Sequence, residues 1–253
     1  LSVNGVQRMA CARNHSATHL LQKALRNVLG SHVEQAGSDV TADRLRFDFT
    51  HFEAMSGEEL KKVEDEVNRE ILAALPVHTE ITTMEEARKK GAMALFGEKY
   101  GDRVRMVMMG DYSVELCGGT HLSNTAQAGC FKILSEGGVA AGVRRIEALT
   151  GEKALEYFRK QDQELELIAH ILKTSKEKAA GQIKTLMEEL KTLQKELAGV
   201  KAKMTANAAD DIMKDVQKVE EISVLSAFRP ELDANALRQM GDTLKGKLGD
   251  CVI

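Results

Sequence analysis

The sequence predicts an α+β domain over residues 1–150, a helical arm over 151–205 and an incomplete β-α-β segment over 206–253. Three observations lead to this division. Short alternating runs punctuated by glycine fill the first part, apolar residues spaced by three and four fill the second, and a strand–helix–strand pattern ends the third. With 253 residues, 43% of them hydrophobic, the chain is long enough for two domains and a connector.

The helices of the first domain follow from apolar periodicity and from capping patterns. A helix is expected over 13–29, where the apolar residues fall on one side. Ser56 and Glu59 form a capping-box pattern that begins a helix over 57–75, and a similar pattern at Thr83 begins a shorter helix.

The strands of the first domain follow from alternation. Residues 33–49 predict two strands around a turn at 41–43, because apolar residues alternate with charged ones after the turn. Further strands are expected over 104–109, 113–116, 129–134 and 143–149.

Beyond Thr150 the pattern becomes that of packed helices. Apolar residues recur at alternating steps of three and four, and we expect the later part of this seam to be buried against another helix. Ser175 offers a cap that would divide the arm, so one long helix and a hairpin both remain open. The apolar seam consists of Ile183, Leu186, Leu190, Leu193, Leu197, Val200 and Met204.

The last segment predicts a strand over 222–225, a helix over 233–248 capped by Asp233, and a strand over 251–253 that stops abruptly. The chain begins at Leu1, and no basic region with an apolar stretch follows. It is therefore expected to be an internal piece of a longer protein.

Composition narrows the functional classes. No apolar run approaches the roughly 18–20 residues that span a bilayer, so no membrane partner is expected. The four cysteines are too few and too scattered for a disulfide framework, which favours a reducing, cytoplasmic compartment. The net charge of -3 leaves any nucleic-acid surface to local patches. One such patch is 173–203, with eight lysines against four glutamates, although a solvated helix surface is the ordinary interpretation.

Two short motifs carry metal-ligating side chains. In RNHSATH, His15 and His19 are four residues apart on the predicted helix, so both imidazoles project from one face. In LCGGTH, Cys117 and His121 flank two glycines that allow the backbone to curl and the two side chains to converge. Together the motifs offer three nitrogens and one sulfur, a soft tetrahedral set suited to zinc.

The ligand pattern excludes a helical HExxH metalloprotease, but it does not distinguish a structural zinc site from a catalytic one. A helical HExxH metalloprotease requires a glutamate directly after the first histidine, but Ser16 stands there, so the general base is missing. A structural zinc site closed by four ligands would use the same four residues as a catalytic one.

Five stretches of the chain carry a resemblance, namely 13–21, 45–49, 91–100, 117–121 and 141–147. In order and spacing they closely resemble the editing region of bacterial alanyl-tRNA synthetases. The paired His and Cys/His motifs also occur in free-standing alanyl-tRNA editing proteins and in threonyl-tRNA synthetases, but the MALFGE segment and the long arm favour the alanyl enzyme. The resemblance is specific over about residues 8–160 and holds only in outline beyond.

The resemblance implies a zinc-binding editing domain of the threonyl/alanyl-tRNA synthetase second-additional-domain type. Its activity would be aminoacyl-tRNA ester hydrolysis, acting on seryl- or glycyl-tRNA(Ala), because a pocket shaped for alanine cannot exclude glycine and rejects serine poorly. The ATP-dependent ligase site would lie outside this chain. By the same resemblance His15, His19, Cys117 and His121 would hold zinc. A non-catalytic, zinc-stabilised tRNA-binding module is the alternative, and self-association through the arm or the C-terminal segment is a further expectation.

Four more residues gain expected roles from the resemblance. Gln35 matches an editing-site glutamine that would place substrate or water. Thr18 would touch the amino-acid side chain, although a threonine there can equally hydrogen-bond its own helix. Arg144 and Arg145 would reach tRNA phosphates, or would form surface ion pairs instead.

Overall fold

The computed structural model describes residues 2–93, 101–228, 230 and 234–253. The chain divides into two compact units, Leu1–Gln163 and Glu164–Ile253. Among the helices of the described residues, none has the length and apolarity to cross a membrane. The finer division at residues 150 and 205 stays a prediction.

The helices of the first unit begin at side-chain caps. The Asn4 side chain accepts hydrogen bonds from two backbone N–H groups and starts the first helix well before residue 13. The capping box of Ser56 and Glu59 is confirmed, with each side chain bonded to the other's backbone, and Thr83 caps the short helix. In chain order these elements are α1 (Gly5–Leu29), α2 (Gly57–Leu72), α3 (Met84–Lys89) and the 3-10 turn η1 (Thr125–Ala128).

Two antiparallel sheets complete the first unit. β3 was not expected from the sequence, and β6 runs on beyond residue 134 because its glycine-containing end pairs with β7. The first sheet, in spatial order, is β1 (Gln35–Val40), β2 (Leu45–Thr50), β7 (Val143–Thr150) and β6 (Phe131–Ala140). The second is β3 (Val77–Thr83), β4 (Arg103–Met109) and β5 (Ser113–Leu116).

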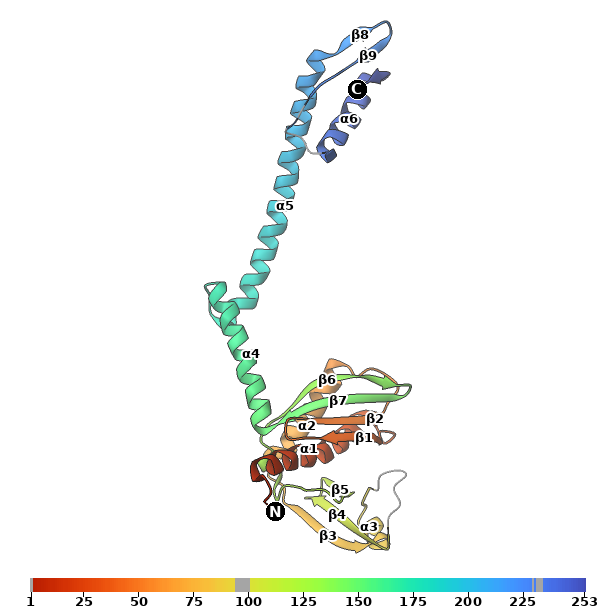
Figure 1. Ribbon diagram of the computed structural model, residues 1–253, viewed down its shortest axis with the longest axis vertical. Coiled ribbons are helices and arrows are strands. Elements are labelled where there is room, and N and C mark those ends of the chain that lie inside the picture. The colour runs from red at the N-terminus through yellow and green to blue at the C-terminus, as the bar shows by residue number, and fades with distance from the viewer. Residues whose placement is uncertain (1, 94–100, 229, 231–233) are drawn as a thin grey trace. The chain divides into compact units, whose positions relative to one another are not determined.

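The core of the first unit forms around α1, which lies between the two sheets (Figure 1). Leu20, Leu21 and Leu25 of α1 are fully buried, as are Phe47 and Phe49 of β2. Burying side chains of this size removes about 1.5–3 kcal/mol of unfavourable hydration from each. This packing holds α1 at a fixed distance from both sheets.

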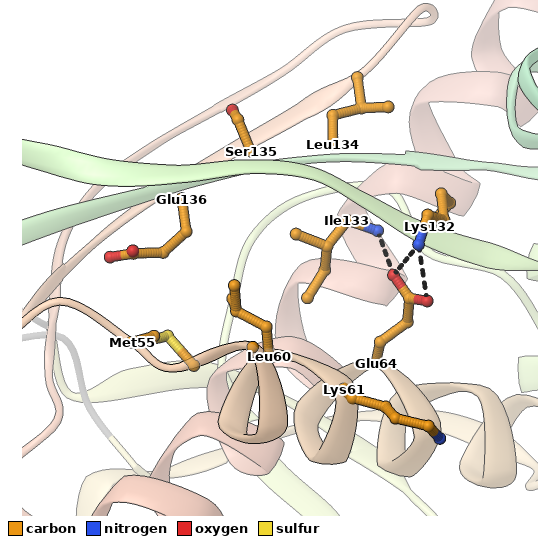
Figure 2. A pocket seen from close by; sticks show the side chains of 10 residues that line it. Met55, Leu60, Lys61, Glu64, Lys132, Ile133, Leu134, Ser135 and Glu136 are labelled. Atoms are coloured by element: carbon orange, nitrogen blue, oxygen red, sulfur yellow. Dashed lines mark hydrogen bonds and ion pairs between the residues drawn. The ribbon is translucent and has the colours of Figure 1, made fainter. Parts of the chain in front are cut away.

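Side chains of α2 hydrogen-bond the backbone of the edge strand β6 (Figure 2). Glu64 accepts hydrogen bonds from the Ile133 backbone N–H at 2.8 Å and from Lys132 Nζ at 2.9 Å. Asn68 exchanges two 2.9 Å hydrogen bonds with the backbone of Phe131. The start of β6 therefore finds on α2 the partners that an edge strand otherwise lacks.

The C-terminal part of the second unit contains the expected β-α-β segment. β10 pairs parallel to β9, so β9, α6 and β10 form that segment, while β8 adds an antiparallel strand that the sequence did not predict. Asp233, expected to cap the helix, lies outside the described residues, as do residues 94–100 of the resembling stretch 91–100. The elements are α5 (Lys176–Ile212), the 3-10 turn η2 (Met213–Asp215), β8 (Gln217–Val219), β9 (Ile222–Val224), α6 (Ala234–Leu248) and β10 (Cys251–Val252).

The arm is helical with one interruption. α4 (Gly151–Ile171) ends before α5 begins, and Ser175 stands at the N-cap position of α5 without a side-chain capping bond. The interruption contains Lys173 at φ 51°, a left-handed conformation that ends a helix. The apolar seam of α5 is exposed in this chain, from 43% at Leu186 to 65% at Met204. Its burial against another helix in an assembly stays a prediction.

Candidate metal centre

The structure brings His15, His19, Cys117 and His121 together between α1 and the loop that follows β5. One ligand atom from each side chain lies within 4.8 Å of the others. The two helical histidines share a face because they are one turn apart. The other two residues reach the same point from a loop that is distant in sequence.

Two of the distances among these atoms match the spacing within a tetrahedral ligand shell. Cys117 Sγ lies 3.5 Å from His15 Nε2 and 3.3 Å from His121 Nε2. An ion with metal–nitrogen bonds of about 2.0–2.1 Å and a metal–sulfur bond of about 2.3 Å places its tetrahedral ligands roughly 3.3–3.6 Å apart. Both sulfur–nitrogen distances fall in this range, and all four ligand atoms lie within 4.8 Å of one another, so the four side chains are close enough together to be candidates for ligating one metal ion.

Gly119 allows the loop to approach α1 closely. A Cβ atom at this position would lie 2.1 Å from His15 Cε1, so a side chain there would displace the ring. The Gly119 N–H donates to Cys117 Sγ at 3.4 Å. Arg105 on β4 fixes the same loop, since its Nη1 donates to the carbonyls of Cys117 and Gly119, each at 2.8 Å.

The electrostatics favour a thiolate at Cys117. Burial raises the pKa of this thiol, but hydrogen bonds from His121 and His15 and the nearby His19 outweigh burial and lower the pKa to about 3. The thiolate is the form of cysteine that ligates metals. Burial also lowers the pKa of His121 and so favours its neutral, ligating form.

Ser16 orients His121. Its hydroxyl lies 3.3 Å from His121 Nδ1 and accepts the backbone N–H of Leu122 at 3.1 Å. With Nδ1 engaged, Nε2 of the same ring is directed towards Cys117. Sequence reasoning used Ser16 only to exclude a metalloprotease and did not anticipate this contact.

Glu115 is a second residue that sequence reasoning missed. Its Oε2 lies 2.5 Å from His19 Nδ1, and both residues are buried. Burial on its own lowers the pKa of His19, but the Glu115 carboxylate and Cys117 together outweigh it and raise the pKa to about 10. Alternation along β5 places Ser113 and Glu115 on one face, and Cys117 follows at the same two-residue spacing just after the strand ends. A charged residue two positions before a candidate ligand was therefore the available signal.

His19 Nε2 supplies a test of whether a metal ion fits. This nitrogen is buried and has no hydrogen-bond partner among the residues that the structure describes. Buried polar atoms are nearly always partnered, and each exception calls for an explanation. A bound ion at the centre of the cluster would supply the missing partner.

The structure places Thr18 and Gln35 in local hydrogen bonds. Thr18 is buried, and its Oγ1 donates to the Asn14 carbonyl one turn earlier at 2.9 Å, which is the own-helix alternative considered above. Gln35 begins β1, and its Nε2 donates to Ser38 Oγ at 3.1 Å. Their roles towards a substrate stay predictions.

The two arginines form ion pairs across the four-stranded sheet. Arg144 donates to Glu136 through Nε at 2.5 Å and Nη2 at 2.8 Å. Arg145 donates to Asp48 through the same two nitrogens at 2.7 and 2.8 Å. The ion-pair alternative therefore describes this structure, and contact with tRNA phosphates stays a prediction.

Comparison with known proteins adds to this geometry. The family described as "Threonyl and Alanyl tRNA synthetase second additional domain" matches residues 104–147, which include β5 and the Cys117–His121 half of the cluster. Alanine--tRNA ligase 1 of Lachnoclostridium phytofermentans is 54% identical over 253 residues, 100% of this chain and 29% of the relative. Alanine--tRNA ligases of Acetivibrio thermocellus and Clostridioides difficile are 53% and 54% identical over 100% and 97% of the chain, 29% and 28% of their own length.

The chain thus spans about 29% of the length of the first relatives that it matches. The similarity covers both units of the chain. The chain is homologous, over its whole length, to one segment of the alanine–tRNA ligase family.

Proposed function

We propose that the first unit holds a zinc ion at His15, His19, Cys117 and His121 and hydrolyses the ester bond of seryl- or glycyl-tRNA(Ala). This is the post-transfer editing reaction of an alanine–tRNA ligase. The observation that carries the proposal is the convergence of three imidazoles and one thiolate within 4.8 Å. That donor set suits zinc, and the match of residues 104–147 to a domain family named for threonyl and alanyl synthetases, which includes Cys117 and His121, supports the proposal.

The proposed reaction needs little beyond placement of the ester. The aminoacyl bond is an ester already activated towards water, and zinc, when bound, supplies a Lewis acid beside it. Gln35 would place the substrate or water, Thr18 would contact the amino-acid side chain, and Arg144 and Arg145 would exchange their ion pairs for tRNA phosphates. An apolar alanine pocket discriminates weakly against glycine and serine, which is why a second, hydrolytic selection step is required.

Cys117 is proposed as a ligand rather than as a nucleophile. A nucleophilic cysteine pairs with one base that a third group orients. Here His15 and His121 both direct Nε2 at the same sulfur, and His19 lies beside them. Three imidazoles around one thiolate form a ligand shell rather than a catalytic dyad.

Partners follow from the proposed reaction. The polynucleotide partner is tRNA(Ala), including its seryl and glycyl forms, and the cytoplasm is the proposed compartment. We further propose that the apolar seam of α5 mediates self-association, because strict alternation of three and four residues is the spacing of coiled-coil helices and the seam is exposed in a single chain.

One observation favours a second function, a non-catalytic zinc-stabilised tRNA-binding module. Four protein ligands already complete a tetrahedral shell, as they do in structural zinc sites, whereas catalytic sites usually keep one position open. In that case the metal would hold the loop of Cys117 against α1, and tRNA would bind without reaction.

Deacylation of seryl-tRNA(Ala) separates the two functions. The assay is run at saturating tRNA with the zinc-loaded chain, after verified zinc removal, and after zinc is restored. Editing predicts turnover that disappears with the metal and returns with it. A folded, zinc-loaded chain that binds seryl-tRNA(Ala) without hydrolysing it would instead establish the binding module.

A further inference from the structure

We propose that Glu115 is the positioning residue for His19: it holds the ring so that Nε2 faces the other ligands, and its buried charge offsets that of the bound cation. This inference rests on the metal centre proposed above. It concerns a residue that lies behind the ligand shell and touches neither substrate nor ion.

The carboxylate is held at both of its oxygens. Ser113 Oγ donates to Oε1 at 3.1 Å, and His19 Nδ1 lies 2.5 Å from Oε2. All three residues are buried, with 3% of Ser113, 4% of Glu115 and 8% of His19 exposed. A side chain fixed at two points and shielded from water gives His19 one orientation.

That orientation determines which nitrogen is offered to a metal. With Nδ1 bound to a carboxylate, the only free ligand atom of His19 is Nε2, the buried nitrogen without a hydrogen-bond partner among the described residues. A histidine that lacks such an acceptor can carry its proton on either nitrogen and can turn about its ring torsion. Removing the carboxylate therefore weakens the fourth ligand even though the ligand itself is unchanged.

The charge of Glu115 acts in the same direction. A divalent ion bound by one thiolate and three neutral imidazoles leaves one unit of positive charge in a largely buried site. Burying an uncompensated charge is costly. The Glu115 carboxylate, one imidazole away, offsets that charge, whereas an amide in its place would only accept the Nδ1 hydrogen bond.

Zinc affinity, measured by competition with a chromophoric chelator, tests the proposal without recourse to hydrolysis. Changes behind a ligand shell typically weaken metal binding about 10- to 100-fold. We expect Glu115→Ala to fall near the upper end of that range and Glu115→Gln near the lower end, because glutamine keeps an acceptor and loses the charge. Nitrogen-15 NMR of the zinc-loaded chain should show the His19 proton on Nδ1 in the unsubstituted protein.

Glu64→Gln is the matched control. Glu64 is also a hydrogen-bonded carboxylate of the first unit, but its side chain binds Lys132 and the Ile133 backbone at the start of β6 (Figure 2). Among the described residues, its hydrogen bonds do not involve the four candidate ligands. Its substitution should leave zinc affinity unchanged while lowering the stability of the unit. Equal losses of affinity in Glu64→Gln and Glu115→Gln would show a general effect of destabilisation and overturn the positioning role.

The remaining outcomes are separable. Zinc binding by Glu115→Ala within about twofold of the unsubstituted chain would overturn this inference and leave the metal centre intact. If Glu115→Ala does not fold, the zinc affinity of Glu115→Gln is the test. An affinity equal to that of the unsubstituted chain would also overturn the inference. Failure of the unsubstituted, folded chain to bind zinc would refute the proposed metal centre itself, and this inference with it.

Discussion

The first unit and α5 both carry apolar residues at regular spacing, but they differ in how much of that surface the chain covers. Leu20, Leu25 and Phe47 of the first unit are fully buried, while Leu190 and Leu193 of α5 are 50% and 61% exposed. In the first unit, helix and strand faces meet each other within the chain. A seam with alternating steps of three and four is completed by a second helix of the same kind. The exposed fraction of a side chain therefore distinguishes two kinds of apolar residue. The buried ones stabilise the first unit, and the exposed ones on α5 are available for association.

The largest expected effect is on the free energy of unfolding, which should respond very differently to alanine substitution in the two regions. Phe47→Ala is expected to lower the free energy of unfolding of the first unit by about 3–5 kcal/mol, since it leaves a cavity in a closed core. Leu193→Ala should change the stability of the dilute monomer by less than about 0.5 kcal/mol. Denaturant titrations of both variants make the comparison, and a cost for Leu193→Ala approaching that of Phe47→Ala would mean that the seam is already packed in one chain.

The second expected effect is a loss of hydrolytic activity on substitution in the proposed metal centre. Cys117→Ala should reduce hydrolysis of seryl-tRNA(Ala) by at least about 100-fold, because loss of a ligand costs more than the 10- to 100-fold of a change behind the shell. Cys117 is only partly buried against the core that contains Phe47, so the unfolding transition should persist. Full activity in this variant would refute the ligand assignment.

A control separates ligand from nucleophile at Cys117. A nucleophile forms an acyl-enzyme that can be trapped and is indifferent to chelators. A ligand gives no adduct, and its activity depends on the metal. Rapid quenching of the reaction with radiolabelled serine on the tRNA should show no labelled protein.

On α5 the expected effect is on association and not on chemistry. Leu190→Glu places a charge in the apolar seam and should weaken self-association. The dissociation constant of the oligomer, measured by sedimentation equilibrium, should rise by at least about tenfold. Lys191→Glu, one residue away and outside the seam, is the matched control and should change it little. If both substitutions act equally, general charge rather than the seam governs association.

The smallest effect tests the ion pair of Asp48 with Arg145. The hydrogen bond from Arg145 lowers the pKa of Asp48, so the pair stabilises the fold above the unfolded pKa of about 3.9 and this contribution is lost as pH falls through the lower, folded pKa. Asp48→Asn should therefore cost about 1 kcal/mol at pH 7. The cost should shrink towards zero in strongly acidic solution, and a cost that grows on acidification would contradict the assignment.

The sequence predicts local elements well where pattern and cap agree. The capping box at Ser56 and the strand 113–116 were predicted at the positions where they occur, because both signals are local. β3 and the distal half of β6 were missed. Their residues lack a continuous alternating pattern and form strands because neighbouring strands supply the hydrogen bonds.

The same distinction applies to the candidate site. The four converging side chains could be picked out from the sequence because two compact motifs contain them all. Glu115, Ser16 and Arg105 were not identified, since their roles depend on which side chains tertiary packing sets opposite them. Strand alternation could have placed Glu115 on the face of Cys117, but nothing in the sequence joins that face to His19, 96 positions away.

The long sequence separation within the metal centre has a consequence for synthesis of the protein. His15 and Cys117 are 102 positions apart, so a growing chain presents the helical histidines to solvent well before the ribosome adds the remaining ligands. Two histidines on a helix bind metal only weakly compared with a complete shell of four. At the proposed metal centre, ion capture would therefore await closure of β5 against α1. Metal retention in a nascent chain of increasing length would then report the moment at which this part of the protein acquires its native tertiary structure.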